Sequence, residues 1–531
     1  MRKIWYSGCE KVKWQFNFLV YYKNYFLFLI EQKKLRFTVD TKNDRLVYQK
    51  FFNQALFVLI FLLLCRIIAS YFIPLNDTTE ARYGEIARKM LETGNWVNLL
   101  HDYGVPFWAK PPLSTWLSAA SMTLFGVHEW SARLPSLLLS IGILGLIWSL
   151  AKKRSGFDVA LVAVLVLAGM LLFFLGAGTV MTDPSLTFCC ALSLVAFWHA
   201  VVAKSKPWSY VFFIGLGLGL LAKGPLVLIL IGMPIFLWVL LRKQWRNLWN
   251  NLPWIKGTSL LLVIALPWYI LAELRTPGFL NYFIIGEHFN RFLVPGWTGD
   301  KYGTAHHAPK GMIWLFAIAG TFPWSLVAGK WLISHGSKLS VLFRDEDGWL
   351  CYLALCTIAP LAFFTFAGNI IYPYVLPSLP PFALLFAELW KRSNQSLINS
   401  PWIIRLSAIS GIIFLILTLA FMMKPDWVAK TQKPVINAWI KQQPTPGSNL
   451  VYWGDRTEFS AQFYSSGKAK FTQSVEKLCH LLSNGVDNYF VINSKIVTQI
   501  PPKLFSQFTL IKTIKYKQEK MLLLHCPVLN C

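Results

Sequence analysis

The chain has 531 residues, of which 55% are hydrophobic and only 14% are charged. Soluble domains have about 45–50% apolar and about 25% charged residues, so this composition and the mean hydropathy of +0.46 exclude an ordinary soluble enzyme and a disordered chain. We therefore predict an all-α polytopic membrane protein. Nine cysteines without a CxxC pair favour neither a disulfide scaffold nor a zinc finger.

Basic residues mark the N-terminal segment, residues 1–50. This segment lacks a small-residue cleavage site after a compact apolar core, so it does not resemble a signal peptide. We predict that it is cytoplasmic and lies partly at the membrane interface, facing anionic lipids. The net charge of +26 would suggest nucleic acid in a soluble protein, but here it points to the membrane surface.

Residues 51–424 hold the apolar runs of the predicted membrane domain. A membrane span takes about 17–25 residues, and the run 113–125 is shorter, so it would be a further span or a re-entrant helix. We expect about 11–13 transmembrane helices. The candidate ranges are 52–73, 131–150, 158–178, 185–203, 208–222, 225–241, 257–272, 311–333, 349–367, 375–390 and 402–423.

Positive charge recurs in alternate loops. By the positive-inside rule these loops face the cytoplasm. The remaining loops, among them 74–130, 273–310 and 368–374, then face outward. The basic loops are Lys152-Lys153-Arg154, Lys204-Ser205-Lys206, 242–246, 334–347 with Lys338 and Arg344, and Lys391-Arg392.

Residues 425–531 differ in composition from the membrane domain. The runs Leu450–Trp453, Tyr489–Ile492 and Met521–His525 are typical of strands, and Ser474–Leu482 has a helical pattern. We predict a small extracytoplasmic α/β domain. In an oxidising compartment a disulfide could form there, but spacing does not select a pair among Cys479, Cys526 and Cys531.

The first outward loop, 74–130, contains a predicted surface helix. Its apolar residues follow the period of a helix and form one stripe, with polar residues opposite, so the helix should lie along the membrane surface. Asp77 could cap this helix with Glu80 as its partner, or either acid could take part in a reaction. The stripe is Tyr83, Ile86, Ala87, Met90 and Leu91, and the polar side is Arg82, Glu85 and Lys89.

Other outward loops hold charged residues on stiff turns. Lys110 precedes two prolines, Lys223 precedes Gly-Pro, and Asp183 precedes Pro184. Each has a structural interpretation, as a snorkelling anchor or a helix start. Cations at a lipid boundary, with Arg82 and Arg291 among them, also suit a phosphate whose tail lies in the bilayer, and carboxylates beside them suit a general base.

Three histidines in the loop 273–310 are candidate metal ligands: His288, His306 and His307. A His-His pair is more often solvated or capping than ligating. We therefore expect no metal and no other cofactor, although a divalent ion near these side chains stays an alternative.

Several motifs together resemble the C-type membrane glycosyltransferases, the group of the lipid A aminoarabinose transferase and the protein O-mannosyltransferases. The resemblance covers roughly residues 74–380 and agrees in order and spacing. The motifs are Glu80-Ala81-Arg82-Tyr83 with Ala87-Arg88-Lys89-Met90-Leu91, Lys110-Pro111-Pro112, Thr182-Asp183-Pro184, Lys223-Gly224 and Tyr374-Val375-Leu376-Pro377.

The resemblance implies an enzyme that transfers a sugar from a polyprenyl-phosphate donor, with inversion, to an envelope acceptor at the outer face of the bacterial inner membrane. Lipid A or another glycolipid is the favoured acceptor, and a protein acceptor is the alternative. The resemblance places Arg82, Tyr83, Lys223 and Tyr374 near the donor phosphate. It pairs Lys110 with Asp183, and it makes an acid of the first loop, Glu80 or Asp77, the base or the group that positions the acceptor.

The chain also departs from the family pattern. Thr79 stands where relatives have Asp, Ala109 replaces a Glu before Lys-Pro, and Asn369 lies where relatives carry a lysine. The alternative of another class is a transporter or flippase of a lipid-linked solute. It would need ionisable residues near the bilayer midplane and internal repeats. The sequence shows no such repeat, which favours the enzyme.

Overall fold

The computed structural model describes residues 42–303, 306–336, 345–393, 400–423, 430–454, 458–516 and 519–527. Most of the predicted basic segment 1–50 lies outside these ranges. The chain divides into two compact units, Met1–Asn53 and Gln54–Cys531. In the first unit the described residues are the start of a helix, α2 (Lys42–Phe72), and the rest of this section concerns the second unit.

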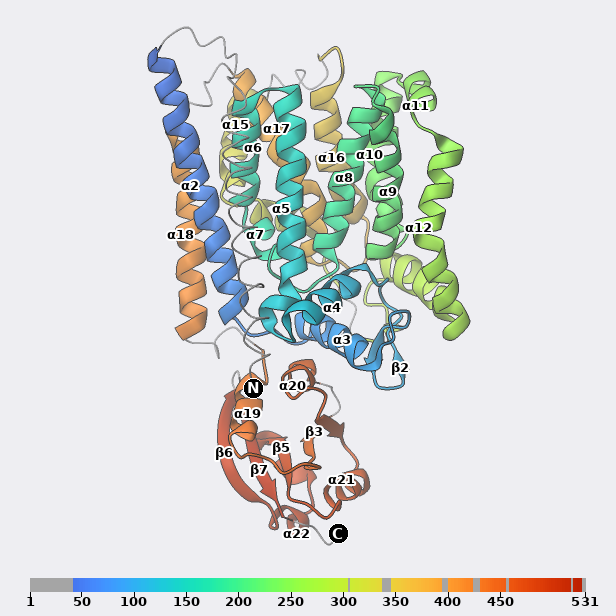
Figure 1. Ribbon diagram of the computed structural model, residues 1–531, viewed down its shortest axis with the longest axis vertical. Helices are drawn as coiled ribbons and strands as arrows, with labels where there is room; N and C mark the ends of the chain where they lie inside the picture. The colour runs from blue at the N-terminus through green and yellow to red at the C-terminus, as the bar shows by residue number, and fades with distance from the viewer. Residues whose placement is uncertain are drawn as a thin grey trace, which may run out of the picture. The chain divides into compact units, whose positions relative to one another are not determined.

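Helices make up nearly all of the membrane region (Figure 1), and each predicted apolar range contains at least one. They are α3 (Thr79–Thr93), α4 (Leu113–Phe125), α5 (Glu129–Arg154), α6 (Phe157–Ala168), α7 (Leu171–Gly176), α8 (Asp183–Val201), α9 (Lys206–Lys223), α10 (Leu226–Arg242), α11 (Trp245–Asn251), α12 (Trp254–Arg275), the π-helix η1 (Asn281–Asn290), α13 (Arg291–Leu293), α14 (Met312–Gly320), α15 (Trp324–His335), α16 (Trp349–Thr365), the 3₁₀ helix η3 (Tyr372–Ser378), α17 (Leu379–Arg392) and α18 (Pro401–Met423).

The polytopic helical fold is confirmed, but many helices are shorter than the predicted spans. In the described part of the chain, five helices are long and apolar enough to cross a bilayer: α2, α5, α8, α12 and α18. The pair α14–α15, bent by 110°, would add a sixth, and α6, α10 and α16 are shorter apolar helices. The bend lies at Pro323, which cannot donate the hydrogen bond that would continue α14.

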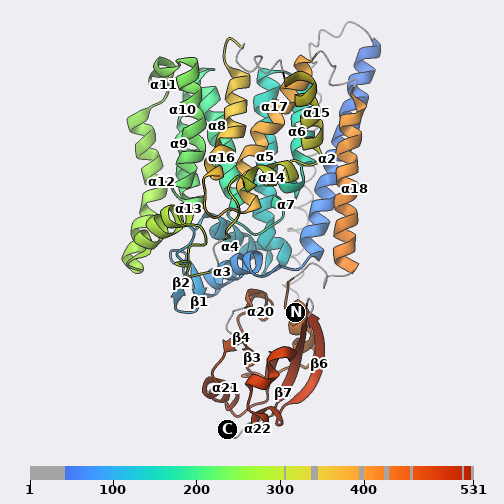
Figure 2. The same cartoon turned by 180° about the vertical axis from the view of Figure 1, so that it is seen from behind.

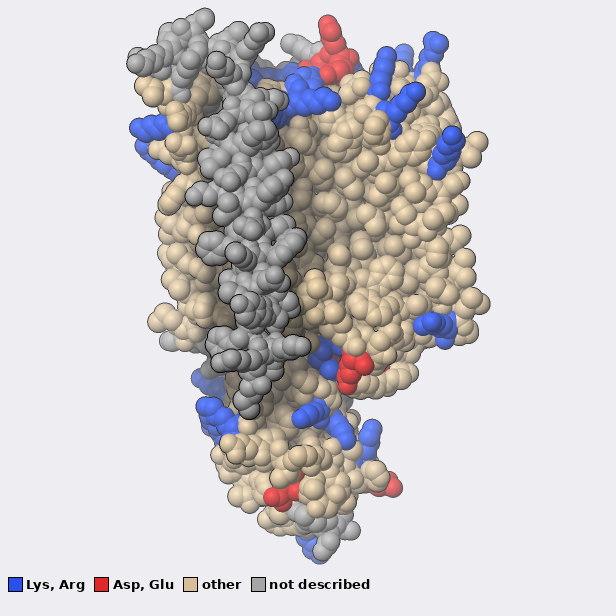
Figure 3. All heavy atoms as spheres, viewed as in Figure 1, with Lys and Arg blue, Asp and Glu red and all other residues tan. Residues whose placement is uncertain are grey.

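Several of the basic loops predicted to share one side of the membrane meet at one end of the helices. Arg154 at the end of α5 contacts Asp347 at 2.6 Å, and Arg392 at the end of α17 pairs with Asp345. Arg242 at the end of α10 donates to the carbonyl of Asp345 at 2.6 Å. Figure 3 shows Lys and Arg side chains gathered at this end. The ends of α5, α10 and α17 therefore lie together, which agrees with a common side for these three loops; the side of the membrane stays a prediction, and Lys338 and Arg344 lie outside the described residues.

Helix α3 lies at the opposite end, packed against α4 and against the C-terminal region. Its apolar stripe is buried as predicted. A helix that lies along the membrane surface would expose its polar side to water, but Glu85 and Lys89 are fully buried. The Lys89 ammonium donates to the Gln462 side chain and to the His101 carbonyl, both at 3.0 Å. The polar face of α3 is therefore covered by a segment almost 400 residues away in the sequence.

The C-terminal region forms the predicted α/β domain. Its five-stranded sheet has the order β4-β3-β5-β7-β6, with β3 parallel to β4 and β5 and the β6–β7 hairpin antiparallel (Figure 2). The predicted strands and the predicted helix are present, and β4 and β6 are additional. The elements are α19 (Lys433–Ile440), β3 (Leu450–Trp453), α20 (Phe459–Tyr464), β4 (Ala469–Thr472), α21 (Val475–Leu482), β5 (Asn488–Asn493), η5 (Ser494–Gln499), α22 (Pro502–Phe505), β6 (Thr509–Tyr516) and β7 (Glu519–Cys526).

Both faces of this sheet are covered by helices. Alternate residues of β3 explain this arrangement: Tyr452 packs in the cluster with α19, and Val451 packs in the cluster with α21. Cys479 on α21 is disulfide-bonded, whereas Cys526 is a buried free thiol.

Candidate active site

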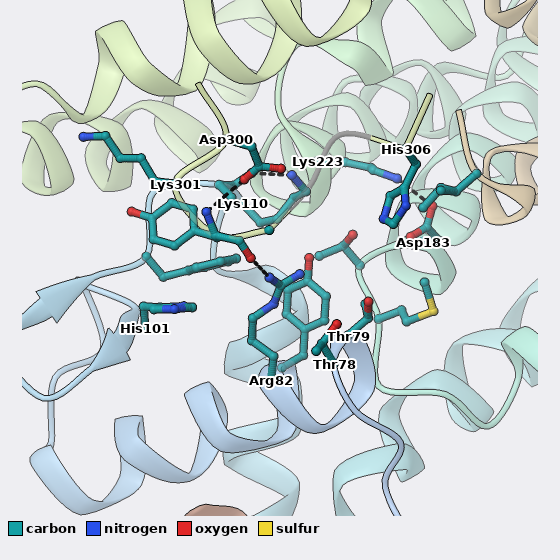
Figure 4. Close-up of a pocket in the computed structure, with 18 of the residues that line it drawn as sticks. Thr78, Thr79, Arg82, His101, Lys110, Asp183, Lys223, Asp300, Lys301 and His306 are labelled. Carbon is teal, nitrogen blue, oxygen red and sulfur yellow. Dashed lines mark hydrogen bonds and ion pairs between the residues drawn. The ribbon is translucent and has the colours of Figure 1, made fainter. Parts of the chain in front are cut away.

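A cavity of about 410 Å³ lies where α3, the β1–β2 hairpin (Leu100–Asp102 and Val105–Pro106), the start of α8 and the end of α9 meet. Figure 4 shows the side chains that point into it. The fold brings together most of the predicted site residues at this cavity, from segments nearly 300 residues apart. Those on its wall are Arg82, Tyr83, Lys110, Asp183, Lys223, Arg291 and Tyr374.

Asp183 and Lys223 form a buried ion pair, with 2.6 Å between carboxylate and ammonium. The ammonium also lies 4.4 Å from the centre of the Tyr374 ring. Helices α8 and α9 are packed side by side, so the first residue of α8 meets the last residue of α9. The chain turns sharply after Lys223, because Gly224 has a φ of +74° and a Cβ there would lie 2.6 Å from the Phe283 ring.

Lys110 does not pair with Asp183, so the pairing implied by the resemblance is wrong. Its ammonium instead contacts the Glu287 carboxylate at 2.7 Å. Arg291 contacts Glu287 at 3.2 Å and Asp300 at 3.1 Å. Burial alone would raise the pKa of Glu287, but Lys110 and Arg291 outweigh it and hold that pKa below its usual range. Sequence analysis missed Glu287, although its i, i+4 spacing to Arg291 was a signal.

A second, apolar cavity of about 380 Å³ adjoins the first. Its lining includes the large apolar side chains of Phe289 on η1 and Leu293 on α13, which are 57% and 66% exposed. The two cavities share one wall, which we call the cationic wall: Lys110, Lys223, Arg291 and Tyr374. Two lysines and an arginine, each paired with a carboxylate, therefore lie between a polar chamber and an apolar groove.

The other end of the polar cavity is aromatic. The Arg82 guanidinium donates to the Tyr302 carbonyl and lies over the rings of Tyr83 and Phe107, at 5.7 and 5.6 Å. The Tyr302 hydroxyl in turn donates to the Pro106 carbonyl at 2.8 Å. Sequence analysis missed Tyr302, since nothing in its local pattern distinguishes it from other loop tyrosines.

Neither acid of the first loop is among the described residues that line the cavity. Both Glu80 oxygens accept from the Arg133 guanidinium at 2.8 Å, and one also accepts from the Asn76 amide at 3.2 Å. Glu80 therefore anchors the start of α3 to α5.

Asp77 points toward the C-terminal domain. Its carboxylate accepts from the amide of Ser460 at 2.9 Å and from the Ser460 hydroxyl. Burial raises the pKa of Asp77 well above its usual range, and Glu458 raises it further. Thr78, without a side-chain cap bond, occupies the N-cap position of α3, so the predicted capping role of Asp77 is wrong.

The three candidate histidines have different surroundings in the structure. The His288 ring nitrogens lie 2.8 Å from the Phe283 carbonyl and 3.2 Å from the Lys223 carbonyl. His306 lines the polar cavity, and His307 forms an isolated β-bridge with Asn369. Across the described ranges, no three His, Cys, Asp or Glu side chains gather as a metal site would require.

Asn369 has a structural role. Its amide donates to the carbonyls of Arg291 and Val294, at 2.7 and 2.8 Å, and its oxygen accepts from the Gly296 amide at 2.9 Å. These bonds fix the segment that carries Arg291, a residue of the cationic wall, to the segment that carries Asn369.

Residues 50–283 match the family model described as dolichyl-phosphate-mannose-protein mannosyltransferase. Among curated proteins, the undecaprenyl phosphate-alpha-4-amino-4-deoxy-L-arabinose arabinosyl transferase of Enterobacter sp. is 29% identical over 331 residues, covering 60% of this chain and 57% of that protein. The transferase of the same name from Serratia proteamaculans is 30% identical over 340 residues, covering 60% and 56%. The chain thus spans little more than half the length of these relatives.

Two crystal structures of ArnT from Cupriavidus metallidurans, one bound to undecaprenyl phosphate and one in the apo state, have the same fold. Their TM-scores are 0.73 and 0.72 at 18% identity, and the matches cover 88% and 89% of this chain and 97% and 98% of theirs. The chain therefore has the ArnT fold and, in its membrane region, resembles the aminoarabinose transferases and the protein mannosyltransferase family, as its motifs predict.

Proposed function

We propose that this membrane protein is a glycosyltransferase that moves a sugar from a polyprenyl-phosphate donor to an envelope acceptor. One observation carries the proposal: the cationic wall is shared by a polar cavity and an apolar groove. A lipid-phosphate sugar has the same three parts in the same order, an apolar tail, an anionic phosphate and a polar ring. The names of the curated relatives support this substrate class.

The cationic wall would hold the donor phosphate. Lys223 and Lys110 supply ammonium groups, Arg291 supplies a guanidinium, and Tyr374 lies beneath the Lys223 charge. Charge-assisted contacts of this kind are the strong ones for phosphate. When the bond between the anomeric carbon and the phosphate oxygen breaks, the leaving polyprenyl phosphate gains charge, which these fixed cations stabilise. Tyr83 and Arg82 line the same polar cavity outside the cationic wall, with Arg82 at its aromatic end.

Asp183 is the one of the three predicted catalytic acids that lines the cavity among the described residues. We assign to it the orientation of Lys223 and the acceptance of the acceptor's proton. Glu80 and Asp77 then act through the position of α3. Attack by the acceptor on the side of the sugar opposite the phosphate would invert the anomeric carbon.

The active site would face outward from the bacterial inner membrane, with the C-terminal domain on the same side and the N-terminus in the cytoplasm. Two observations support this orientation: Cys479 is disulfide-bonded, and disulfides persist in oxidising compartments; and the basic loops lie at the opposite end. Single cysteines at Thr93 and Lys470 should label from outside in a chain otherwise without free thiols, and one at Lys153 only from the cytoplasm. Labelling of Thr93 and Lys470 from opposite sides would contradict the orientation.

Lipid A is the favoured acceptor, because the matched curated relatives are aminoarabinose transferases. The match of residues 50–283 to the protein mannosyltransferase model keeps a protein acceptor as the second candidate. Neither comparison supports a transporter.

The test uses the purified full chain in detergent with an undecaprenyl-phosphate-linked sugar and lipid A. We expect mass spectrometry to find lipid A heavier by one sugar residue, and undecaprenyl phosphate to bind. The double variant Asp183→Asn/Lys223→Met, which leaves no unpaired buried charge, is the matched control. A wild-type chain that neither binds undecaprenyl phosphate nor transfers sugar to lipid A or to protein would contradict the proposal.

A further inference from the structure

A cluster of four ring side chains lines the aromatic end of the polar cavity, where a second ligand group could bind. The His101 ring lies 5.0 Å from the Tyr302 ring, 5.1 Å from the Phe459 ring and 6.0 Å, stacked, from the Phe107 ring. All four side chains line the polar cavity, and none lines the apolar groove. We call these four residues the His101 platform.

The His101 platform is set apart from the cationic wall. Figure 4 shows His101 and Lys223 on different sides of the cavity, with Arg82 on a third. A sugar bonded directly to the donor phosphate would stay beside the cationic wall. The platform is therefore available to the other reactant.

His101 offers hydrogen-bonding capacity that the protein does not use. Its Nδ1 is buried out of reach of the cavity and has no partner within the described ranges. Its Nε2 makes no hydrogen bond to any described residue and is not buried in the same way, so Nε2 is the nitrogen that a ligand in the cavity can reach. Burial lowers the pKa of His101 to about 4, and the charges of Arg82 and Lys89 act in the same direction. The ring is thus neutral at physiological pH and presents one donor and one acceptor nitrogen. The Nε2 atom is therefore a fitting partner for a ligand hydroxyl in the cavity.

Phe459 adds a contribution from the C-terminal domain. It is the first residue of α20, it is 5% exposed, and it belongs to the apolar cluster around α3. The next residue, Ser460, bonds to Asp77 and fixes α20 in place. The C-terminal domain therefore supplies part of the wall of the polar cavity, in a part that the apolar groove does not share.

We propose that the His101 platform receives a sugar ring of the acceptor, with His101 binding one hydroxyl and the aromatic rings packing against the apolar face of the sugar. The proposal rests on the proposed glycosyltransferase function and names the acceptor class, a glycan-bearing molecule. Phe459 and His101 then determine acceptor specificity, and the C-terminal domain is part of the acceptor site.

The test separates the two substrates by steady-state kinetics of the full chain, with undecaprenyl-phosphate-linked sugar as donor and lipid A as acceptor. His101→Phe keeps an aromatic ring in the platform and removes both nitrogens. Loss of one hydrogen bond should raise the acceptor KM about tenfold, while the donor KM moves by less than about twofold. His101→Gln, which keeps hydrogen-bonding atoms, should recover part of the loss.

Phe459→Leu removes the ring supplied by the C-terminal domain, and we expect it to raise the acceptor KM as well. Phe463→Leu is the matched control: it makes the same change on the same helix, but Phe463 packs near Gly84 and is not among the lining residues. Its acceptor KM should equal that of the wild type, and thermal unfolding would report any loss of stability in either variant.

Three results would overturn the proposal without contradicting the glycosyltransferase function. They are an unchanged acceptor KM in His101→Phe, an acceptor KM that rises as much in Phe463→Leu as in Phe459→Leu, or a rise in the donor KM instead of the acceptor KM. Transfer by the wild type to protein rather than to lipid A would also overturn it. Failure of the wild type to bind undecaprenyl phosphate and to transfer sugar would remove the proposed function, and this inference with it.

Discussion

Replacement of Lys223 by methionine tests whether the Asp183–Lys223 pair acts in transfer or only in folding. The pair is buried, with its side chains 7% and 5% exposed. Lys223→Met leaves the carboxylate buried without its cation, which costs about 3–5 kcal/mol of stability. A lost charge-assisted contact to the donor phosphate costs a further 1.5–3 kcal/mol or so in the reaction, an effect of roughly 10- to 150-fold. A low rate in the single variant would therefore have two causes.

The double variant Asp183→Asn/Lys223→Met separates these causes, since it also removes the stranded charge. We expect it to recover most of the unfolding temperature in detergent, while its transfer rate per folded molecule stays at least about tenfold below the wild type. The assay is sugar transfer from undecaprenyl-phosphate-linked donor, with folded protein quantified by gel filtration. A double variant with the wild-type rate would refute the reasoning and reduce the pair to a structural element.

Three further outcomes follow from the first loop and its neighbours. Glu80→Gln should lower the unfolding temperature, because the buried Arg133 loses its carboxylate partner. The transfer rate per folded molecule should fall by less than about tenfold. A loss of about 10²–10⁴-fold would instead identify Glu80 as a general base. Because the pKa of Asp77 is raised in the folded protein, this group contributes stability that is present at low pH and is lost as pH rises through that pKa. Asp77→Asn should therefore flatten this part of the curve of unfolding temperature against pH. A curve equal to that of the wild type would contradict the prediction. The pKa of His101 is lowered to about 4, so its contribution to stability is present above about pH 6.5 and is lost as pH falls through 4. The unfolding temperature of His101→Phe should therefore fall less steeply with acid than that of the wild type. An equal fall in both proteins would count against a neutral His101.

Periodicity and loop charge predicted much of the fold, because both reflect local physics. The apolar stripe of α3 and the common end of the basic loops follow from which side chains tolerate lipid or water. The buried polar face of α3 could not be predicted this way, since its partner Gln462 is far along the chain. Span lengths were overestimated where Pro323 or a short break divides an apolar run.

The sequence predicted most of the residues that form the candidate site, but not which of them contact each other. The order of the motifs predicted that Lys110, Asp183 and Lys223 belong to one site. Which lysine pairs with the Asp183 carboxylate depends on how α8 and α9 pack. Phe459 had no sequence signal, because it reaches the cavity only through the docking of α20 on α3.

The covered polar face of α3 makes the C-terminal domain unsuitable as an interchangeable module. Its removal would leave Glu85 and Lys89, now fully buried, facing water beside an apolar surface, and would strip Asp77 of its bonds to Ser460. A chimera that joins this membrane region to another soluble domain must therefore carry α20 along with α3. Because α20 follows β3, an inner strand of the sheet, it cannot be kept without the rest of the sheet, so the whole C-terminal domain must stay with this membrane region.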